Sequence, residues 1–320
     1  MTSSKAPYFI LLGILSLVSI ALALSVGSVS DADSAIIYQL RLPRVLVAFA
    51  VGGLLAMSGA LLQVLTRNPL AEPSVLGVSG GASVGALAVL TIGGAGSLWV
   101  AGGAWLGALA VLFLLWILVG GLSNNSSRLL LAGVMIATGC GAIVTLMISF
   151  ASNATLPGMI HWLMGDLDSV MSLEAVGAIL GVWLSVLLIV WKNATKIHLM
   201  QLGADKAMTL GVDIKHIQWL MIMLAAFATA ASVSIAGAIG FVGLLVPHLL
   251  RAMIVKKYGP DQTFLLPASA LLGGIFLVLS DMIARTIIAP SQLPVGVITA
   301  LIGVPSFLWI LSRLRHWSAS

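Results

Sequence analysis

The chain has 320 residues, of which 60% are hydrophobic and only 8% are charged, and its mean hydropathy is +1.15. About 25% of the residues in a soluble domain are charged, so this composition excludes an ordinary soluble protein and indicates a polytopic membrane protein. The net charge of +5 does not point to nucleic acid, because the basic residues stand singly between apolar runs, as topology signals do. We therefore expect membrane lipid around the chain and no nucleic-acid partner.

Apolar runs of about 20 residues, long enough to cross a bilayer as a helix, follow one another along the chain. The first run, 8–27, has features of a signal peptide but is long enough to span, and we favour an uncleaved first helix. No residue from Ile217 to Leu250 is charged, which is too long for one crossing, and Gly237, Gly240 and Gly243 divide this stretch into two helices. The sequence predicts ten spanning helices, over 8–27, 44–65, 75–93, 98–121, 128–151, 171–191, 217–236, 240–256, 264–287 and 294–314.

These ten helices fill the chain, so the predicted fold class is an all-α membrane protein with a single transmembrane domain, residues 1–320. The run 158–166 is too short to cross and is predicted to lie at the membrane surface. Small residues four positions apart, Gly52 with Ala56 and Gly81 with Gly85, predict close contacts between helix backbones.

The basic residues predict the orientation, because Lys and Arg mark cytoplasmic loops. With ten spans both termini lie on one side. Placing them in the cytoplasm leaves only Arg41, Arg44 and Arg285, of 15 Lys and Arg residues, on the outer side. These three arginines are on the wrong side for a topology signal, so we expect them to have another role. Snorkelling to lipid headgroups is an alternative for Arg44.

The sequence offers no enzyme site, and we expect neither a cofactor nor a bound metal. Cys140 is the only cysteine, which excludes a cysteine-based metal site, and the five histidines show no ligand spacing such as His-x-x-x-His. The glycine-rich stretch 77–85 lacks the Gly-Lys-Ser/Thr ending of a phosphate loop, and no such motif occurs elsewhere. The chain is therefore not expected to hydrolyse ATP by itself.

The other nine acidic residues fall in loops or near helix ends, so Asp281 is the only one well within a predicted span. Arg285 follows four residues later on the same helical face. We interpret the two as a self-neutralised pair. Ion coupling usually needs carboxylates inside the bilayer, so an ion-coupled secondary transporter that uses Asp281 is the alternative function.

The polar stretch 192–216, with a loop at about 196–216, is the longest one predicted on the cytoplasmic side. Its centre, 202–210, can form a short helix between the glycines at 203 and 211. A surface helix between two glycine breaks can insert as a unit into a groove on a partner. An ordinary solvated loop is the alternative.

Four stretches, 41–83, 127–133, 237–251 and 293–311, together resemble the FecCD-type permeases. These permeases are the membrane subunits of ABC importers for iron chelates, haem and vitamin B12. The motifs NPLAEP (68–73) and GFVGLLVPHLLR (240–251) are the most specific, and the resemblance runs over nearly the whole length.

The resemblance implies a homodimer in the bacterial inner (cytoplasmic) membrane. This homodimer works with two ATP-binding cassette ATPase subunits and a periplasmic or lipoprotein substrate-binding protein. The ATPase activity then resides in a partner, and the permease translocates a metal chelate into the cytoplasm. Ferric siderophore and vitamin B12 are equally favoured as cargo, with haem third.

The resemblance also implies a role for several residues, each of which we treat as an expectation. The three outer arginines would meet carboxylates of the binding protein. The cytoplasmic gate would be Asn125, Ser126 and Ser127, with an ordinary helix N-cap as the alternative. Ser79, Gly80 and Gly81 would lie on the pathway, where glycine at 80 leaves more room than the larger residue of some members. The residues expected to couple the chain to the ATPase are Leu202, Gly203, Ala204, Asp205, Ala207, Leu210 and Gly211.

Overall fold

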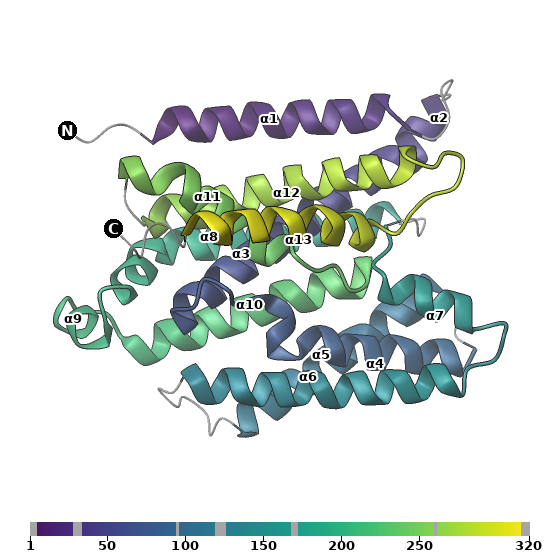
Figure 1. Ribbon diagram of the computed structural model, residues 1–320, viewed down its shortest axis with the longest axis horizontal. Coiled ribbons are helices and arrows are strands. Elements are labelled where there is room, and N and C mark those ends of the chain that lie inside the picture. The colour runs from purple at the N-terminus through teal and green to yellow at the C-terminus, as the bar shows by residue number, and fades with distance from the viewer. Residues whose placement is uncertain are drawn as a thin grey trace.

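The computed structural model describes residues 5–27, 34–93, 96–118, 126–167, 172–258 and 261–314, and every regular element in these ranges is helical (Figure 1). In chain order the elements are α1 (Ala6–Ser25), α2 (Ser34–Ile36), the π-helical η1 (Ile37–Arg41), α3 (Leu42–Thr66), the 3₁₀-helical η2 (Pro73–Leu76), α4 (Val78–Thr91), α5 (Ser97–Leu118), α6 (Ser126–Ser149), α7 (Leu156–Leu163), α8 (Leu173–Met200), α9 (Ala204–Thr209), α10 (Ile214–Ala236), α11 (Val242–Tyr258), α12 (Gln262–Thr286) and α13 (Val295–Leu314).

Each of the ten predicted spans contains a helix, and the surface helix predicted at 158–166 is α7. Among the described residues, seven helices are long and apolar enough to cross a membrane, and three shorter apolar helices cover 78–91, 242–253 and 295–309. A helix of 14 residues such as α4 is about 21 Å long, less than the bilayer core of about 30 Å. The structure thus confirms an all-helical polytopic membrane protein, and the crossing of the three shorter helices stays a prediction.

The largest boundary error concerns α8, predicted to end at 191 but continuing to Met200. Hydropathy marks where a helix lies in lipid, whereas helical structure also continues into water. The last turns of α8 carry Lys192, Asn193 and Lys196, which extend the helix past its apolar part. For this reason an apolar run underestimates the length of a helix that projects from the membrane.

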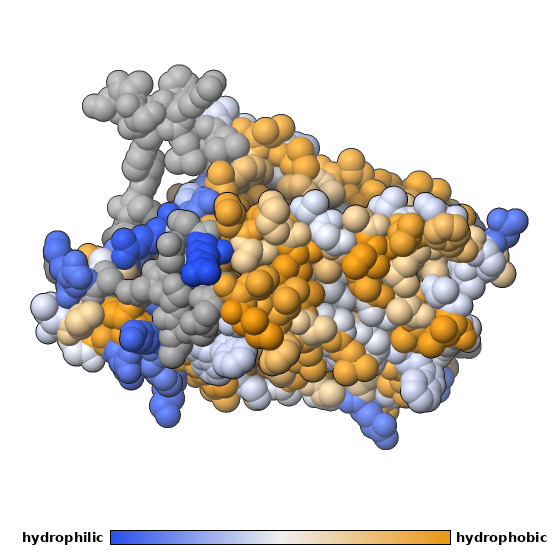
Figure 2. All heavy atoms as spheres, turned by 90° about the horizontal axis from the view of Figure 1, so that it is seen from below, coloured by the Kyte–Doolittle hydropathy of each residue, from blue (hydrophilic) through white to orange (hydrophobic). Residues whose placement is uncertain are grey.

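The long helices run roughly side by side along the long axis of the molecule (Figure 1). The beginning of α1, the end of α13 and the short helix α9 lie at one end, which we call the α9 end. The helices α2 and α7 and the connection from α12 to α13 lie at the opposite end, the α7 end. On the face shown in Figure 2, apolar surface covers much of the middle, and hydrophilic residues gather mainly toward the α9 end.

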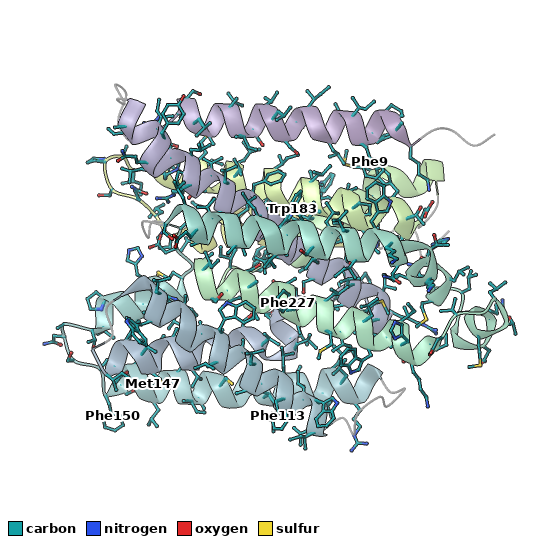
Figure 3. The ribbon with its side chains drawn as sticks, turned by 180° about the vertical axis from the view of Figure 1, so that it is seen from behind. Phe9, Phe113, Met147, Phe150, Trp183 and Phe227 are labelled. Atoms are coloured by element: carbon teal, nitrogen blue, oxygen red, sulfur yellow. The ribbon has the colours of Figure 1, made fainter. Side chains whose placement is uncertain are left out.

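Exposed apolar side chains cover the outer helices. Phe113 of α5 and Phe150, just after α6, are both exposed, and they lie on the outside of the helix bundle (Figure 3). An apolar surface of this extent is typical of a protein whose surroundings are lipid or another subunit rather than water.

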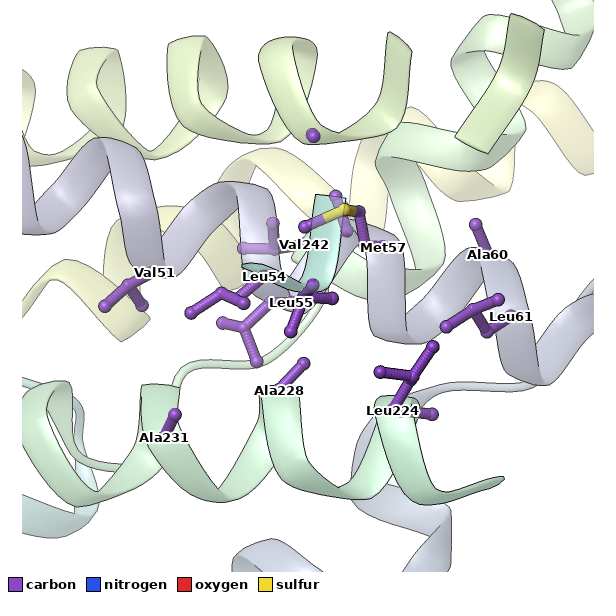
Figure 4. Packing of buried hydrophobic residues seen from close by; sticks show 14 of the residues in the cluster. Val51, Leu54, Leu55, Met57, Ala60, Leu61, Leu224, Ala228, Ala231 and Val242 are labelled. Carbon is purple, nitrogen blue, oxygen red and sulfur yellow. The ribbon is translucent and has the colours of Figure 1, made fainter. Parts of the chain in front are cut away.

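The helix α3 forms the centre of the molecule. Nearly all of its side chains are buried, and it packs against α10, α11 and α12. On the side of α10, residues such as Leu55 and Leu61 face Leu224 and Ala228 (Figure 4). A helix that is apolar all round is expected in such a position, because every one of its faces has a protein neighbour.

Glycines bring the helix backbones together where the sequence predicted it. A Cβ atom added at Gly52 of α3 would overlap the carbonyl group of Gly273 in α12. In the same way, a Cβ at Gly81 or Gly85 of α4 would overlap the backbone of α5 at Gly107 or Gly103. The predicted small-residue contacts are confirmed, and they hold α4 on α5 and α12 on α3.

The first helix is attached to α12 at the α9 end. The Lys5 ammonium group donates hydrogen bonds to the carboxylate of Asp261 and, at 3.0 Å, to the hydroxyl oxygen of Thr263. The rings of Phe9 and Phe264 pack with their centroids 4.8 Å apart. Burial raises the pKa of the Asp261 carboxyl, but hydrogen bonds from Lys5 and Thr263 outweigh that effect, so this pKa lies below its ordinary value.

Two neighbouring glycines of α5 allow a direct test of the backbone contacts. In Gly103→Val the new Cβ would lie 2.5 Å from Cγ2 of Val89 and 2.6 Å from the carbonyl oxygen of Gly85. We expect this substitution to lower the free energy of unfolding by about 1–3 kcal/mol, the usual cost of overpacking. Thermal unfolding of the purified protein in detergent measures the effect. The control is Gly102→Val, where no atom lies within 4 Å, and equal destabilisation by both substitutions would contradict the prediction.

Candidate functional site

A buried ionic cluster at the α7 end contains all three arginines that the sequence placed on the outer side. Asp281 of α12 is its centre: Nε and Nη2 of Arg44 donate to Oδ1 at 3.0 Å and 2.8 Å, and Nε of Arg285 lies 3.0 Å from Oδ2. Gln292 extends the cluster, since its side-chain oxygen accepts a 2.8 Å hydrogen bond from Nη1 of Arg44. The predicted pair of Asp281 and Arg285 is therefore confirmed, and Arg44 is a second partner of the same carboxylate.

Two of the arginines also bind the end of α1. Nη1 of Arg41 donates to the carbonyl oxygen of Leu24 at 2.9 Å, and Nη2 of Arg285 donates to that of Ala23 at 3.2 Å. The last carbonyl groups of a helix have no partner within the helix and form the negative end of its dipole, which favours cations there. The cluster therefore attaches α1 to α3 and α12 at the α7 end, opposite the contact of Lys5.

The described part of the cluster contains three guanidinium groups and one carboxylate. Two of these groups, those of Arg44 and Arg285, contact the carboxylate of Asp281 directly. The cluster is largely shielded from solvent, since Arg41 is 6% exposed and Arg285 is 4% exposed. Such a site acts on an anionic partner mainly through its electric field and less through a large contact area. That these arginines dock a binding protein stays a prediction.

The predicted helix between two glycines is present as α9. Gly203 and Gly211 have φ values of 108° and 79°, a left-handed region that favours glycine, and they separate α9 from its neighbours. Leu202 and Leu210 are 51% and 58% exposed, whereas Ala207 is buried and anchors the segment. The remaining two positions are less informative: Asp205 is exposed in the first turn of α9, and the side chain of Ala204 lies outside the described part. The segment thus presents apolar side chains at the α9 end, and its role in coupling stays a prediction.

The three predicted pathway residues lie at the beginning of α4. Gly81 packs against Gly107 of α5, and Ser79 is half-buried with its carbonyl oxygen bound by the hydroxyl group of Ser83. At Gly80 the neighbouring helix α6 lies close, and whether glycine leaves room for cargo there stays a prediction. A Cβ at Gly80 would lie 2.9 Å from Cβ of Cys140, because α6 occupies the space that a side chain would need.

The three predicted gate residues fall at the edge of the described chain. Asn125 lies outside the described residues. Ser126 and Ser127 begin α6, but their side chains are not among those described. A gate at these positions therefore stays a prediction.

No group of three or more His, Cys, Asp and Glu side chains in the described ranges could hold a metal ion. One histidine, His161 at the end of α7, lies 3.7 Å from the carboxylate of Asp166, and both side chains are partly exposed. A single histidine with one carboxylate is too few ligands for a protein metal centre.

Replacing the central carboxylate of the cluster is a test of its structural role. We expect Asp281→Asn to lower the free energy of unfolding by about 3–5 kcal/mol, because Arg44 and Arg285 would lose the charge that compensates their burial. Denaturation in detergent measures the change, with Asp205→Asn in the exposed helix α9 as control. A variant that keeps its stability but loses all transport would instead favour ion coupling through Asp281.

Comparison with known proteins identifies the family. The model of the FecCD transport family matches residues 8–313. The chain is 38% identical over 292 residues to the vitamin B12 import system permease protein BtuC of Vibrio cholerae. This match covers 89% of this chain and 85% of that relative. The chain is 40% identical over 306 residues to the uncharacterized ABC transporter permease protein YvrB of Bacillus subtilis, a match that covers 92% of this chain and 84% of that relative. A cobalamin import system permease protein of Halobacterium salinarum is 40% identical over 286 residues, a match that covers 88% of this chain and 75% of that relative.

Solved structures agree with the sequence comparison. A chain from an ABC transporter described as of the metal-chelate type, in an inward-facing conformation, superposes with a TM-score of 0.86 at 29% identity and covers 97% of this chain and 99% of that one. A chain of PsaBC from Streptococcus pneumoniae has a TM-score of 0.58 at 18% identity and covers 84% and 90%, which shows a shared fold alone. The chain belongs to the FecCD transport family, and it is an ABC transporter permease, the transmembrane component and not the ATPase.

Proposed function

We propose that this permease imports a metal chelate into the cytoplasm, driven by a separate ATPase subunit. The observation that carries the proposal is the likeness to metal-chelate and vitamin B12 systems over nearly the whole chain, in sequence and in fold. Two relatives named for vitamin B12 or cobalamin favour a corrinoid as cargo over a ferric siderophore, with haem third.

The proposed topology has ten spans with both termini in the cytoplasm of a bacterium, and the membrane is its inner membrane. It is supported by the position of the helix ends, because α1 begins and α13 ends at the α9 end (Figure 1). Four lysines in or beside the ends of α8, α9 and α10 lie at that same end, as cytoplasmic residues do: Lys192, Lys196, Lys206 and Lys215. The α7 end, with the arginine cluster, then faces outward.

The proposed complex contains two copies of this chain, each a single transmembrane domain, with two ATPase subunits and one substrate-binding protein. The exposed helix α6 supports a subunit contact, since only 17% of the most apolar 18-residue stretch of this helix is buried. Its apolar surface is available either to lipid or to a second copy.

The proposed mechanism couples the two ends of the molecule. The helix α9, with exposed Leu202 and Leu210, inserts into the ATPase, so that closure of the ATPase moves the permease between two rigid arrangements. The binding protein delivers cargo at the α7 end, and the cargo passes Ser79, Gly80 and Gly81 and leaves by the gate at Asn125, Ser126 and Ser127. At Gly80 this requires α6 to move away from α4, because Cys140 now occupies the space.

Uptake by the reconstituted complex tests the proposal. Vesicles that contain the permease with its own ATPase and binding protein should accumulate labelled vitamin B12 when ATP is supplied on the cytoplasmic side. A ferric siderophore offered in parallel decides between the two cargo classes. An ionophore should leave this uptake unchanged. Uptake that ignores ATP and collapses with the ionophore would support the ion-coupled alternative.

The electric field of the arginine cluster provides a second prediction. In the double variant Arg41→Gln and Arg285→Gln, Arg44 still neutralises Asp281, while two positive charges are removed from the cluster. We expect the association rate of the binding protein to fall about tenfold at low salt and the salt dependence to flatten, as measured by stopped-flow fluorescence. The double variant Lys192→Gln and Lys196→Gln removes the same charge at the α9 end and should leave the rate unchanged. A rate that both double variants reduce equally would show a general charge effect instead.

The exposed apolar side chains beside α9 provide a third prediction. We expect Leu210→Asp to abolish copurification of the ATPase, because a charged group would replace an apolar contact in the proposed groove. Leu173→Asp, which changes an even more exposed leucine at the opposite end of α8, is the control and should retain the ATPase. Retention by both variants would exclude Leu210 from the contact.

A further inference from the structure

The beginning of α11 meets the beginning of η2, the short helix that leads into α4, beside α3. Gly243, in the first turn of α11, lies so close to Gly59 of α3 that a Cβ at Gly59 would overlap its backbone. The same Gly243 lies against Pro73, the first residue of η2, which leads into α4. Two breaks in the helical backbone therefore come together inside the protein, where their polar groups need partners.

Glu72 supplies the bond that joins the two breaks. Its Oε1 atom accepts a hydrogen bond from the backbone N–H of Phe241 with an N···O distance of 2.6 Å. Phe241 directly precedes α11, so the carboxylate lies at the positive end of that helix, where a negative charge is favoured. The side-chain amide of Gln63 makes a second link, donating to the carbonyl oxygens of Ala71 at 3.3 Å and Gly243 at 3.2 Å.

Phe241 has an unusual backbone conformation. Its φ is 69°, in the left-handed region that a bulky residue rarely adopts. Its side chain packs on Gly303 of α13, where an added Cβ would lie 2.7 Å from Cβ of Phe241. A conformation of this kind persists only where the surroundings determine it, and it is concentrated at functional positions. The bond from Glu72 and the packing on α13 are the contacts that hold it.

The stretch before α11 connects this point to the α7 end. We call residues 237–241 the connecting segment. At its first residue, Gly237, an added Cβ would overlap the carbonyl oxygen of Trp162 in α7, and just before it the carbonyl oxygen of Ala236 accepts a 2.9 Å hydrogen bond from the N–H of Asp166. The connecting segment thus touches α7 at one end and Glu72 at the other.

We propose that Glu72 is a positioning residue for transport. It holds the connecting segment against the beginning of η2, which leads into α4, so that a displacement of α7 is passed to Ser79, Gly80 and Gly81. The inference rests on the proposed function, in which α7 faces the incoming cargo and these three residues line the pathway. Glu72 acts through its oxygen acceptor and its length, and it need not touch the cargo.

Three substitutions at one position test the proposal in the reconstituted complex with labelled vitamin B12. Glu72→Gln keeps an oxygen acceptor at the same distance, whereas Glu72→Asp is one methylene too short and Glu72→Ala has no acceptor. We expect the amount of cargo taken up per ATP hydrolysed to fall roughly two- to thirtyfold in the Asp and Ala variants, and to stay within about twofold of the natural protein in the Gln variant. Glu174→Ala, which removes the only other glutamate from an exposed position on α8, is the control and should change nothing.

Several outcomes would overturn the proposal. A variant set in which uptake and ATP hydrolysis fall in the same proportion would show that Glu72 only stabilises the fold. If Glu72→Asp keeps normal uptake and Glu72→Gln loses it, the charge of residue 72 matters and the presence of a neutral acceptor is not enough. If the Ala variant does not assemble, the contrast between Asp and Gln still decides.

A second measurement does not depend on the cargo. In hydrogen–deuterium exchange on the purified permease, the segment around Phe241 should exchange at least about tenfold faster in Glu72→Asp than in the natural protein or in Glu72→Gln. Unchanged exchange in Glu72→Asp would refute the bond itself. The absence of ATP-driven uptake in the natural complex, together with the expected exchange pattern, would refute the proposed function and keep the positioning role.

Discussion

A backbone inside a lipid bilayer has no water to bond with, and this constraint determines the architecture of the molecule. Helices satisfy it along most of the chain, because each N–H group bonds to a carbonyl group of the preceding turn. The backbone before η2 and before α11 is not helical, so its polar groups need partners other than the preceding turn. The side chains of Gln63 and Glu72 provide the missing bonds there, and the buried centre of α3 surrounds them. At this point the irregular backbone is covered by protein.

The same scarcity of water determines how the helices associate. Lipid is as apolar as a leucine side chain, so burying leucine against leucine provides little force for association in a membrane. Close approach of backbones at Gly52, Gly85 and Gly273 provides it instead, through dispersion contacts that a larger residue would prevent. The charged side chains follow a related rule, since Arg44 and Arg285 share Asp281 and are not exposed to lipid.

Local features of the sequence predicted the helices, the helix between Gly203 and Gly211, and the glycine contacts, because each of these depends on residues near one another in the chain. The pair of Asp281 and Arg285 was predictable for the same reason, being one helical turn apart. The bonds of Arg44 to Asp281 and of Glu72 to Phe241 were not, since 237 and 169 residues separate the partners. The space at Gly80 was not predictable, because its size depends on the position of α6 as well as on residue 80. Nothing near Gly80 in the sequence indicates that Cys140 faces it.

The attachment of α1 has a consequence for how the chain is made. Arg41 follows it closely in the chain, but its other partners, Asp261 just before α12 and Arg285 on α12, come more than 250 residues later, as the separation of 256 between Lys5 and Asp261 shows. At the usual speed of a ribosome, on the order of 10 to 50 s pass between the synthesis of the two helices. During that interval α1 has its contact with Arg41 but lacks α12, and its apolar composition allows it to stay in the bilayer without that neighbour. The helix α1 therefore completes its packing only after α12 has been made.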